Sequence, residues 1–241
     1  MPKTKAQTDE HPTIFGGWSV RRMLVDEKIQ TRRIVKPQPE MVGTGVWAYK
    51  GLTFHSDETM RSRLFRELYR GDCKYGKADR LWVREAFRLP EWADDVSPAE
   101  YVSDQRKDAG EMPVRYEADG RAAPFHDRVT EEGWGRKRPS IHMPRELCRL
   151  RLRVEQVWVE QLHEINTEDV IAEGIGIDKL RRMYSARGLS LSGSKSSQPA
   201  EAIPKRDWQR AFKWLWNDVH GAGAWEENLW VKVITFTKLD E

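Results

Sequence analysis

Apolar residues alternate with polar ones from Cys148 to Leu162, and this pattern predicts a strand. Arg149, Arg151 and Arg153 occupy the polar positions, so one face of the strand should pack on the core and the other should meet solvent. The apolar positions shift by one residue before Val157, and we expect a bulge or break there. Kinks of this kind turn corners in small closed barrels.

The residues from Lys28 to Arg33 also alternate in a period of two, which predicts a strand that ends before Pro37. Lys28 itself stands at the junction between a preceding helix and this strand. Residues 81–85 and 229–236 have the compact, apolar composition of two further strands.

Helical periodicity and capping signals predict three helices. The first begins near Gly16, where we expect the ordered part of the chain to start. The second has Asn166 as its N-cap and acidic residues in its first turn, and it closes at Glu173 after about two turns. The third begins at Lys205 and stops at Gly221.

Three stretches do not fit this core pattern, and we interpret them as enlargements of a smaller domain. They are residues 40–74, 88–134 and 176–204. The first stretch has a plausible β excursion at 46–54 and a short helix at 60–69, whereas the second is polar and irregular. We therefore predict one domain over residues 14–241, preceded by a flexible tail at residues 1–13.

Composition narrows the class of protein. The 241 residues include 41 Lys+Arg and 38 Asp+Glu, and the net charge of +3 excludes a general polycation. No apolar run approaches the roughly 20 residues of a membrane-spanning helix, and the polar beginning of the chain lacks a secretory signal. Cys73 and Cys148 are too few for a disulfide framework and lack CxxC spacing. We expect a soluble, cytoplasmic protein without a metal or another cofactor.

Charge is more segregated along the chain than the total suggests. Residues 136–153 contain seven Lys/Arg and one Glu, whereas residues 154–173 contain six acids and no Lys or Arg. A solvated strand face beside an acidic helix would explain this pattern, and so would a phosphate-contacting surface beside an acidic pocket. On the second interpretation, the nucleic-acid-binding residues are Arg136, Lys137, Arg138, Arg149, Arg151 and Arg153.

Glu173 conflicts with its position, because a carboxylate in the last turn of a helix meets the negative end of the helix dipole. Such conflicts often mark functional groups, although an exposed glutamate tolerates the same position at small cost. Lys28 and Thr31 offer an amine and a hydroxyl three positions apart. If they face a pocket, Arg32 and Arg33 would depress the pKa of Lys28, and the neutral amine could deprotonate Thr31. A solvated lysine and an ordinary strand threonine are the alternative.

Four segments together resemble the ASCH domain of the phage and prophage type, a family of PUA-like β-barrels. The segments are Lys28–Arg33, Asp79–Glu85, Arg138–Arg145 and Asn228–Phe236. The resemblance covers most of Trp18 to Leu239 and departs at Ala78, where the family usually has glycine. It implies an α+β fold with a small mixed or antiparallel β-barrel, short flanking helices and enlarged loops.

Small bacterial members of this family include N4-acetylcytidine amidohydrolases, whose pattern is a lysine, a threonine three residues later and a glutamate in the helix after a central strand. Lys28, Thr31 and Glu173 match this pattern by order and local context. The resemblance implies that Thr31 attacks the amide carbonyl, that Lys28 is its base, and that Glu173 handles the leaving-group proton or orients the base. The expected substrate-binding residues are Arg32, Arg33, Trp82, Glu85 and Trp225.

Two other functions fit the same sequence. PUA-like barrels commonly bind RNA or recognise modified bases, so a binding module without hydrolytic activity is one alternative, with an affinity that falls as salt rises. A metal-independent ribonuclease is the other. In each case we expect a monomer that acts on a nucleoside or RNA, has no membrane partner and works in the cytoplasm, or in the host cytoplasm if the chain is phage-encoded.

Overall fold

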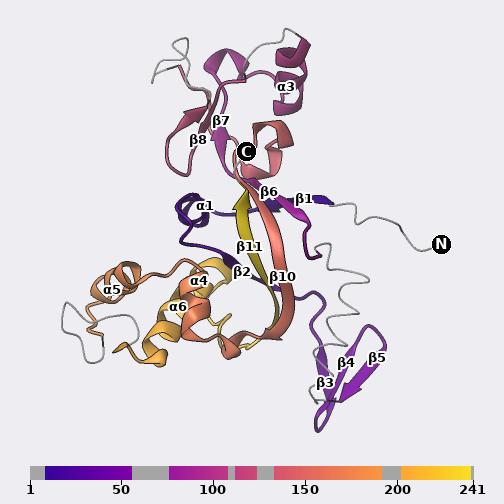
Figure 1. Cartoon of the computed structure of the whole chain (residues 1–241), viewed down its shortest axis with the longest axis vertical. Coiled ribbons are helices and arrows are strands. Elements are labelled where there is room, and N and C mark those ends of the chain that lie inside the picture. Colours follow the sequence, from indigo (N-terminus) through magenta and orange to yellow (C-terminus); the bar gives the residue numbers. More distant parts are fainter. Residues whose placement is uncertain (1–8, 56–75, 108–111, 124–132, 192–201, 240–241) are drawn as a thin grey trace. The chain divides into compact units, whose positions relative to one another are not determined.

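The structure is a computed structural model of an α+β protein with several sheets, as the sequence predicts (Figure 1). It describes residues 9–55, 76–107, 112–123, 133–191 and 202–239. The chain forms two compact units, and each combines segments that are distant in the sequence. The first unit contains residues 1–26, 78–153 and 237–241, and the second contains residues 27–77 and 154–236. The single domain expected from the sequence stays a prediction.

A set of neighbouring strands forms the middle of the first unit. β1 (Glu10–Ile14) runs parallel to β6 (Arg80–Arg84), which pairs in antiparallel with the start of β10 (Arg151–Gln161). Leu81 in β6 is fully buried. The flexible tail expected through residue 13 is wrong for residues 10–13, which already belong to this sheet. Their polar sequence carries no alternation, and their pairing with β6 is what makes them a strand.

The helix predicted near Gly16 is confirmed as α1 (Gly17–Leu24), which buries Val20 and Met23 on one face. One-turn 3-10 helices connect other elements along the chain. They are η1 (Glu91–Ala93), η2 (Ser140–His142), η3 (Arg145–Leu147) and η4 (Leu162–Glu164).

The stretch at 88–134 is more structured than the sequence suggests. It contains α3 (Pro98–Lys107) and most of a small sheet. The strands of this sheet are β7 (Phe87–Arg88), β8 (Val114–Tyr116) and β9 (Ala122–Ala123), in that order. The strands have only two or three residues each, which is too short for a period-two pattern to stand out in the sequence.

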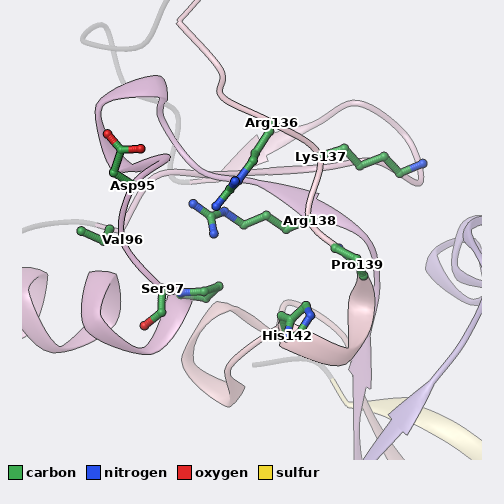
Figure 2. Close-up of a pocket in the computed structure, with 9 residues that line it drawn as sticks. Asp95, Val96, Ser97, Arg136, Lys137, Arg138, Pro139 and His142 are labelled. Atoms are coloured by element: carbon green, nitrogen blue, oxygen red, sulfur yellow. The ribbon is translucent and has the colours of Figure 1, made fainter.

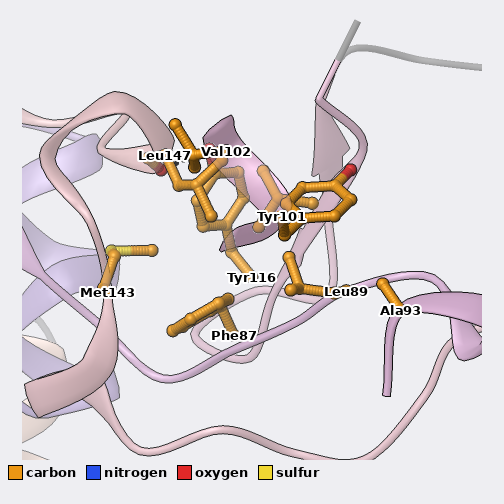
Figure 3. Close-up of a cluster of buried hydrophobic side chains, with 9 residues drawn as sticks. Phe87, Leu89, Ala93, Tyr101, Val102, Tyr116, Met143 and Leu147 are labelled. Atoms are coloured by element: carbon orange, nitrogen blue, oxygen red, sulfur yellow. Dashed lines mark hydrogen bonds between the residues drawn. The ribbon is translucent and has the colours of Figure 1, made fainter. Parts of the chain in front are cut away.

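These short elements share a hydrophobic cluster of their own (Figure 3). The hydroxyl of Tyr101 donates a hydrogen bond to the backbone oxygen of Pro113, and that of Tyr116 donates to Leu147. Both rings are therefore buried without leaving an unsatisfied hydroxyl. The cluster consists of Phe87, Leu89, Ala93, Tyr101, Val102, Val114, Tyr116, Met143 and Leu147.

The second unit is built on the antiparallel pair of β2 (Gln30–Ile34) and β11 (Trp230–Leu239). Thr31 stands opposite Ile234 in this pair, and β10 is the next neighbour of β11. The strands predicted from the alternation at residues 28–33 and 148–162, and from apolar composition at residues 229–236, are thus confirmed, with small differences at their ends.

A second sheet in this unit consists of β3 (Glu40–Gly43), β4 (Val46–Tyr49) and β5 (Leu52–His55), which confirms the β excursion predicted at 46–54. The helix predicted at 60–69 lies outside the described residues. Side chains of this sheet pack against β10 and β11. The buried cluster consists of Val35, Tyr49, Phe54, Val159 and Trp230.

Figure 1 shows the helices α4 (Thr167–Ala172), α5 (Ile177–Ser185) and α6 (Lys205–His220) grouped together in the second unit. α4 contacts both α6 and β2. The predicted caps are confirmed, because Asn166 caps α4 through the backbone N–H of Asp169, and α6 ends before Gly221. α5 was not predicted within the stretch at 176–204, although it is amphipathic and buries Leu180, Met183 and Tyr184.

Gly135 provides a sharp test of packing in the first unit. A methyl group at Gly135 would meet the Oδ1 atom of Asp94 at 2.2 Å. We expect Gly135→Ala to lower the free energy of unfolding by about 1–3 kcal/mol, because the Asp94 carboxylate must move. Urea unfolding measures this change. Gly43→Ala is the control, because its methyl would lie at an ordinary 3.8 Å from Val46. Equal stability of the two variants would contradict the prediction.

Candidate functional site

The junction between α4 and β2 brings Lys28 to Glu173, which is the C-cap of α4. Two backbone hydrogen bonds of 2.9 Å fix this junction, from Ile29 N to Ala172 O and from Phe236 N to Ile29 O. The Lys28 Nζ atom then lies 2.6 Å from Glu173 Oε2 and 2.9 Å from the backbone oxygen of Glu173. The amine thus binds both the carboxylate and a carbonyl at the negative end of the helix.

Arg32 binds the other oxygen of the same carboxylate. Its Nη1 atom is 3.2 Å from Glu173 Oε1. Its Nη2 atom is 2.7 Å from Glu160 Oε1 and 3.1 Å from Asp169 Oδ2. One guanidinium group thereby joins carboxylates from β10, from α4 and from the C-terminal end of α4. We call Lys28, Arg32, Glu160, Asp169 and Glu173 the buried charge cluster.

Further side chains hold the outer carboxylates of the buried charge cluster in place. Trp158 Nε1 donates to Glu160 Oε2 at 2.7 Å, and Gln30 Nε2 donates to Asp169 Oδ1 at 2.9 Å. Asp169 also belongs to the capping box of α4, in which its Oδ2 atom accepts from the backbone N–H of Asn166 at 3.1 Å. The carboxylate positions are therefore set by several bonds that do not involve Lys28 or Arg32.

Burial dominates the electrostatics of this cluster. Lys28, Arg32 and Glu173 are each only 4% exposed. Burial lowers the pKa of Lys28 below the usual lysine value, since it penalises the charged amine; Glu173 opposes this shift, and Arg33 and Arg32 reinforce it. Three carboxylates face two cations in the cluster. A lysine amine that loses its proton more easily than usual, beside a carboxylate, is an arrangement suited to proton transfer.

Thr31 is buried, with 6% of its surface exposed, but its orientation differs from that of its neighbours. Gln30 and Arg32 both reach Asp169, so they share one face of β2. Side chains alternate along a strand, and Thr31 therefore points to the opposite face. The structure thus joins Lys28 to Glu173 and Arg32, and it does not bring Thr31 into the buried charge cluster.

The residues expected to bind substrate fall into different surroundings. Arg33 is half-buried in β2. Trp225 stacks on the ring of His163, with centroids 4.5 Å apart, so one face of the indole is covered. Trp82 and Glu85 belong to the first unit. There Arg84 lies over the Trp82 ring at 4.5 Å from its centroid.

Arg149 is engaged inside the first unit. Its Nε atom is 2.8 Å from Glu85 Oε1, and its Nη1 atom is 3.0 Å from Asp119 Oδ2. The guanidinium also lies over the Tyr116 ring, 3.9 Å from the centroid. We expected Arg149 to contact phosphate and Glu85 to bind substrate, but the two side chains neutralise each other in a nearly buried ion pair.

The other residues predicted to bind nucleic acid differ in exposure. Arg138 is buried, and its Nη2 atom donates to the backbone oxygens of Ala93 and Asp94. Arg136, Lys137 and Arg153 are exposed, and Arg151 is half-buried. The basic block is therefore not one continuous phosphate-facing surface.

Sequence reasoning missed Glu160 and Asp169 as members of the site. Asp169 was interpreted only as an acid in the first turn of a helix, and Glu160 only as part of the acidic block. One signal was available, because Lys28, Gln30 and Arg32 alternate in the sequence and so share one face. Two cations on one buried face require carboxylates opposite them.

Comparison of the chain with models of protein families, with curated protein sequences and with solved structures gives no match. Within the described stretches, no group of three or more His, Cys, Asp or Glu side chains is arranged to hold a metal ion. None of the helices in those stretches has both the length and the apolar composition needed to cross a membrane.

The Lys28–Glu173 pair should matter for stability as well as for chemistry. We expect Glu173→Leu to lower the free energy of unfolding by about 3–5 kcal/mol, because it leaves a buried lysine without its partner. The double variant Lys28→Met/Glu173→Leu should cost less than the sum of the two single changes, since the partners are removed together. Urea unfolding of all three variants measures this coupling.

A matched control is Glu226→Leu, which removes the partner of Lys213 in an ion pair at the surface. Because Glu226 is exposed and Lys213 is partly exposed, this change should have little effect on stability. Additive effects of the Lys28 and Glu173 changes would show that the pair is not coupled.

Proposed function

We propose that this protein is an ASCH-type amidohydrolase that removes the acyl group from an N4-acylated cytidine-type nucleoside or base. The observation that carries the proposal is the buried Lys28–Glu173 pair, with 2.6 Å between Nζ and Oε2 and with a lowered lysine pKa. The order of Lys28, Thr31 and Glu173 in the resemblance to the ASCH family supports the same assignment. The closed PUA-like barrel that this resemblance implies is part of the proposal.

The proposed reaction begins with the neutral amine of Lys28. Lys28 accepts a proton from the nucleophile, which forms a bond to the acyl carbon and gives a tetrahedral intermediate. The bond between the acyl carbon and N4 then breaks, and N4 receives this proton from Lys28, either directly or through Glu173. Water completes the reaction, so one acylated base and one water give the free amine and one carboxylic acid. Before the reaction, Glu173 orients the amine through the hydrogen bond between Nζ and Oε2.

Two groups can act as the nucleophile in this reaction, the Thr31 hydroxyl and a water molecule. The ASCH pattern assigns the attack to Thr31, yet strand alternation turns Thr31 away from the face that carries Gln30 and Arg32. Attack by Thr31 therefore requires that Lys28 Nζ leave Glu173 and turn toward the threonine. A water molecule beside the Lys28–Glu173 pair is the other available nucleophile, and it needs no such movement.

We expect the purified protein to release acetate from N4-acetylcytidine. Lys28→Ala and Glu173→Gln should each reduce kcat/KM by at least about a hundredfold, because general acid–base catalysis contributes about that much. Chromatography of the reaction mixture measures the formation of cytidine over time. Unchanged activity in both variants would overturn the proposal.

Variants at Thr31 identify the nucleophile. Thr31→Ala abolishes the reaction if the hydroxyl attacks, whereas Thr31→Ser retains part of it. If water attacks, Thr31→Ala stays active while Lys28→Ala does not. Thr53→Ala, an exposed strand threonine of β5, is the matched control and should keep full activity.

The pH dependence follows from the lowered pKa of Lys28. Only the neutral amine accepts a proton, so kcat should rise by about tenfold per pH unit up to that pKa and then level off. The plateau should begin below the ordinary lysine value of 10.5. Lys28→Arg, which stays protonated, should be inactive at every pH. A flat profile for the unmodified protein would exclude Lys28 as the base.

The two alternatives stay predictions. A nucleic-acid-binding module draws on the exposed Arg136, Lys137 and Arg153, but it loses Arg138 and Arg149 to internal contacts. A metal-independent ribonuclease would use the same Lys28–Glu173 pair, and cleavage of RNA by a protein that leaves N4-acetylcytidine intact would favour it.

A further inference from the structure

A cavity of about 510 Å³ lies in the first unit, between the residues that precede α3 and the segment 136–142 (Figure 2). Its volume falls within the roughly 300–1,000 Å³ of small-molecule sites. Arg136, Lys137 and Arg138 contribute to its wall, and Asp95 is the one carboxylate among the lining residues within the described part of the chain. The cavity wall therefore has an excess of positive charge.

Two anchored points hold the basic segment against the cavity. The carboxylate of Asp94 accepts the backbone N–H of Arg136, at 2.9 and 3.0 Å for its two oxygens. Two residues later, Arg138 exchanges backbone hydrogen bonds with Phe87, of 2.8 and 3.2 Å. On the side of Arg136 and Arg138, these bonds use backbone atoms only, so the side chain of Arg136 remains available to the cavity.

The two guanidinium groups converge, whereas the lysine between them does not. Figure 2 shows the ends of Arg136 and Arg138 close together and Lys137 extending away from them. Lys137 Nζ lies 3.8 Å from a carboxylate oxygen of Glu117. In the described part of the chain, no carboxylate forms an ion pair with Arg136.

Arg138 also has an unsatisfied donor. The residue is 6% exposed, and its Nη2 atom binds the backbone oxygens of Ala93 and Asp94 at 2.8 and 3.2 Å. Its Nε atom is buried, and it has no hydrogen-bond partner among the residues that the structure describes. Burial and the nearby Arg136 both lower the pKa of Arg138, and Asp94 opposes the shift. Adjacent cations repel each other, so an anion in the cavity would relieve this repulsion.

We propose that this cavity binds a phosphate monoester, with the 5′-phosphate of a nucleotide as the class of ligand. Two guanidinium groups match the double negative charge of a monoester and can bind it through several charge-assisted hydrogen bonds. Val96, Pro98 and Pro139 provide apolar surface for the rest of the ligand, and His142 provides a flat ring. This proposal does not depend on the amidohydrolase activity.

Isothermal titration calorimetry with the full chain tests the proposal. Cytidine 5′-monophosphate should bind more tightly than cytidine, and inorganic phosphate should compete with it. A 5′-phosphorylated oligonucleotide that binds better than its 5′-hydroxyl form would identify a nucleic-acid end as the source of the phosphate. Equal affinities for cytidine and cytidine 5′-monophosphate would overturn the proposal. So would the absence of binding of both cytidine 5′-monophosphate and inorganic phosphate.

Arg136→Gln is the decisive variant, because Arg136 is exposed and its structural bonds come from its backbone. We expect it to weaken binding of cytidine 5′-monophosphate by at least about tenfold. Arg121→Gln removes the same charge from an exposed residue outside the cavity lining and should leave binding unchanged. The thermal unfolding temperature of both variants checks that the fold persists.

Equal affinity of Arg136→Gln and the unmodified protein contradicts the site. The test also separates the two proposals, because Lys28 and Glu173 are unchanged in this variant. If the Arg136→Gln variant loses nucleotide binding but still releases acetate, the result supports the phosphate site and the amidohydrolase independently. If the unmodified protein binds the nucleotide but releases no acetate, only the amidohydrolase is refuted.

Discussion

The second unit depends on the neutralisation of one buried carboxylate. Glu173 stands at the C-terminal end of α4, where the helix dipole disfavours its negative charge, and burial adds a desolvation cost. Lys28 and Arg32 bind its two oxygens and offset both costs. Because the cations come from β2 and its edge, this neutralisation also attaches α4 to the sheet.

The polar face of β2 is consequently a buried face. Lys28, Gln30 and Arg32 all point to carboxylates from β10 and α4, although a strand with this composition would ordinarily turn such residues to solvent. A buried ionic cluster is a poor source of stability compared with apolar packing. Changes to these residues are therefore expected to affect folding as well as the proposed chemistry.

The first unit uses arginine in two different ways. Arg149 is committed to Glu85 and Asp119 and to the Tyr116 ring, and this binding makes it part of the framework. Arg136 and Arg138 instead both line a cavity. Within one basic block of the sequence, arginine side chains thus either join an internal ion-pair network or line a cavity.

The sequence by itself determined several of the regular elements. Period-two alternation located β2 and β10, apolar composition located β11, and the cap at Asn166 located α4 together with Glu173 at its end, because these signals depend only on residues close in the chain. It also linked Lys28 to Glu173 through a family resemblance. It did not find β1 or α3, whose apolar contacts come from distant segments.

Only the tertiary structure decided which charges meet. Arg32 gained Glu160 and Asp169 as partners, and Arg149 gained Glu85, across separations that no local pattern reports. The orientation of Thr31, opposite to that of Arg32, likewise followed from the contacts of its neighbours. Ion pairing acts through space over a few ångströms, so the sequence supplied the charges, and folding selected the pairs.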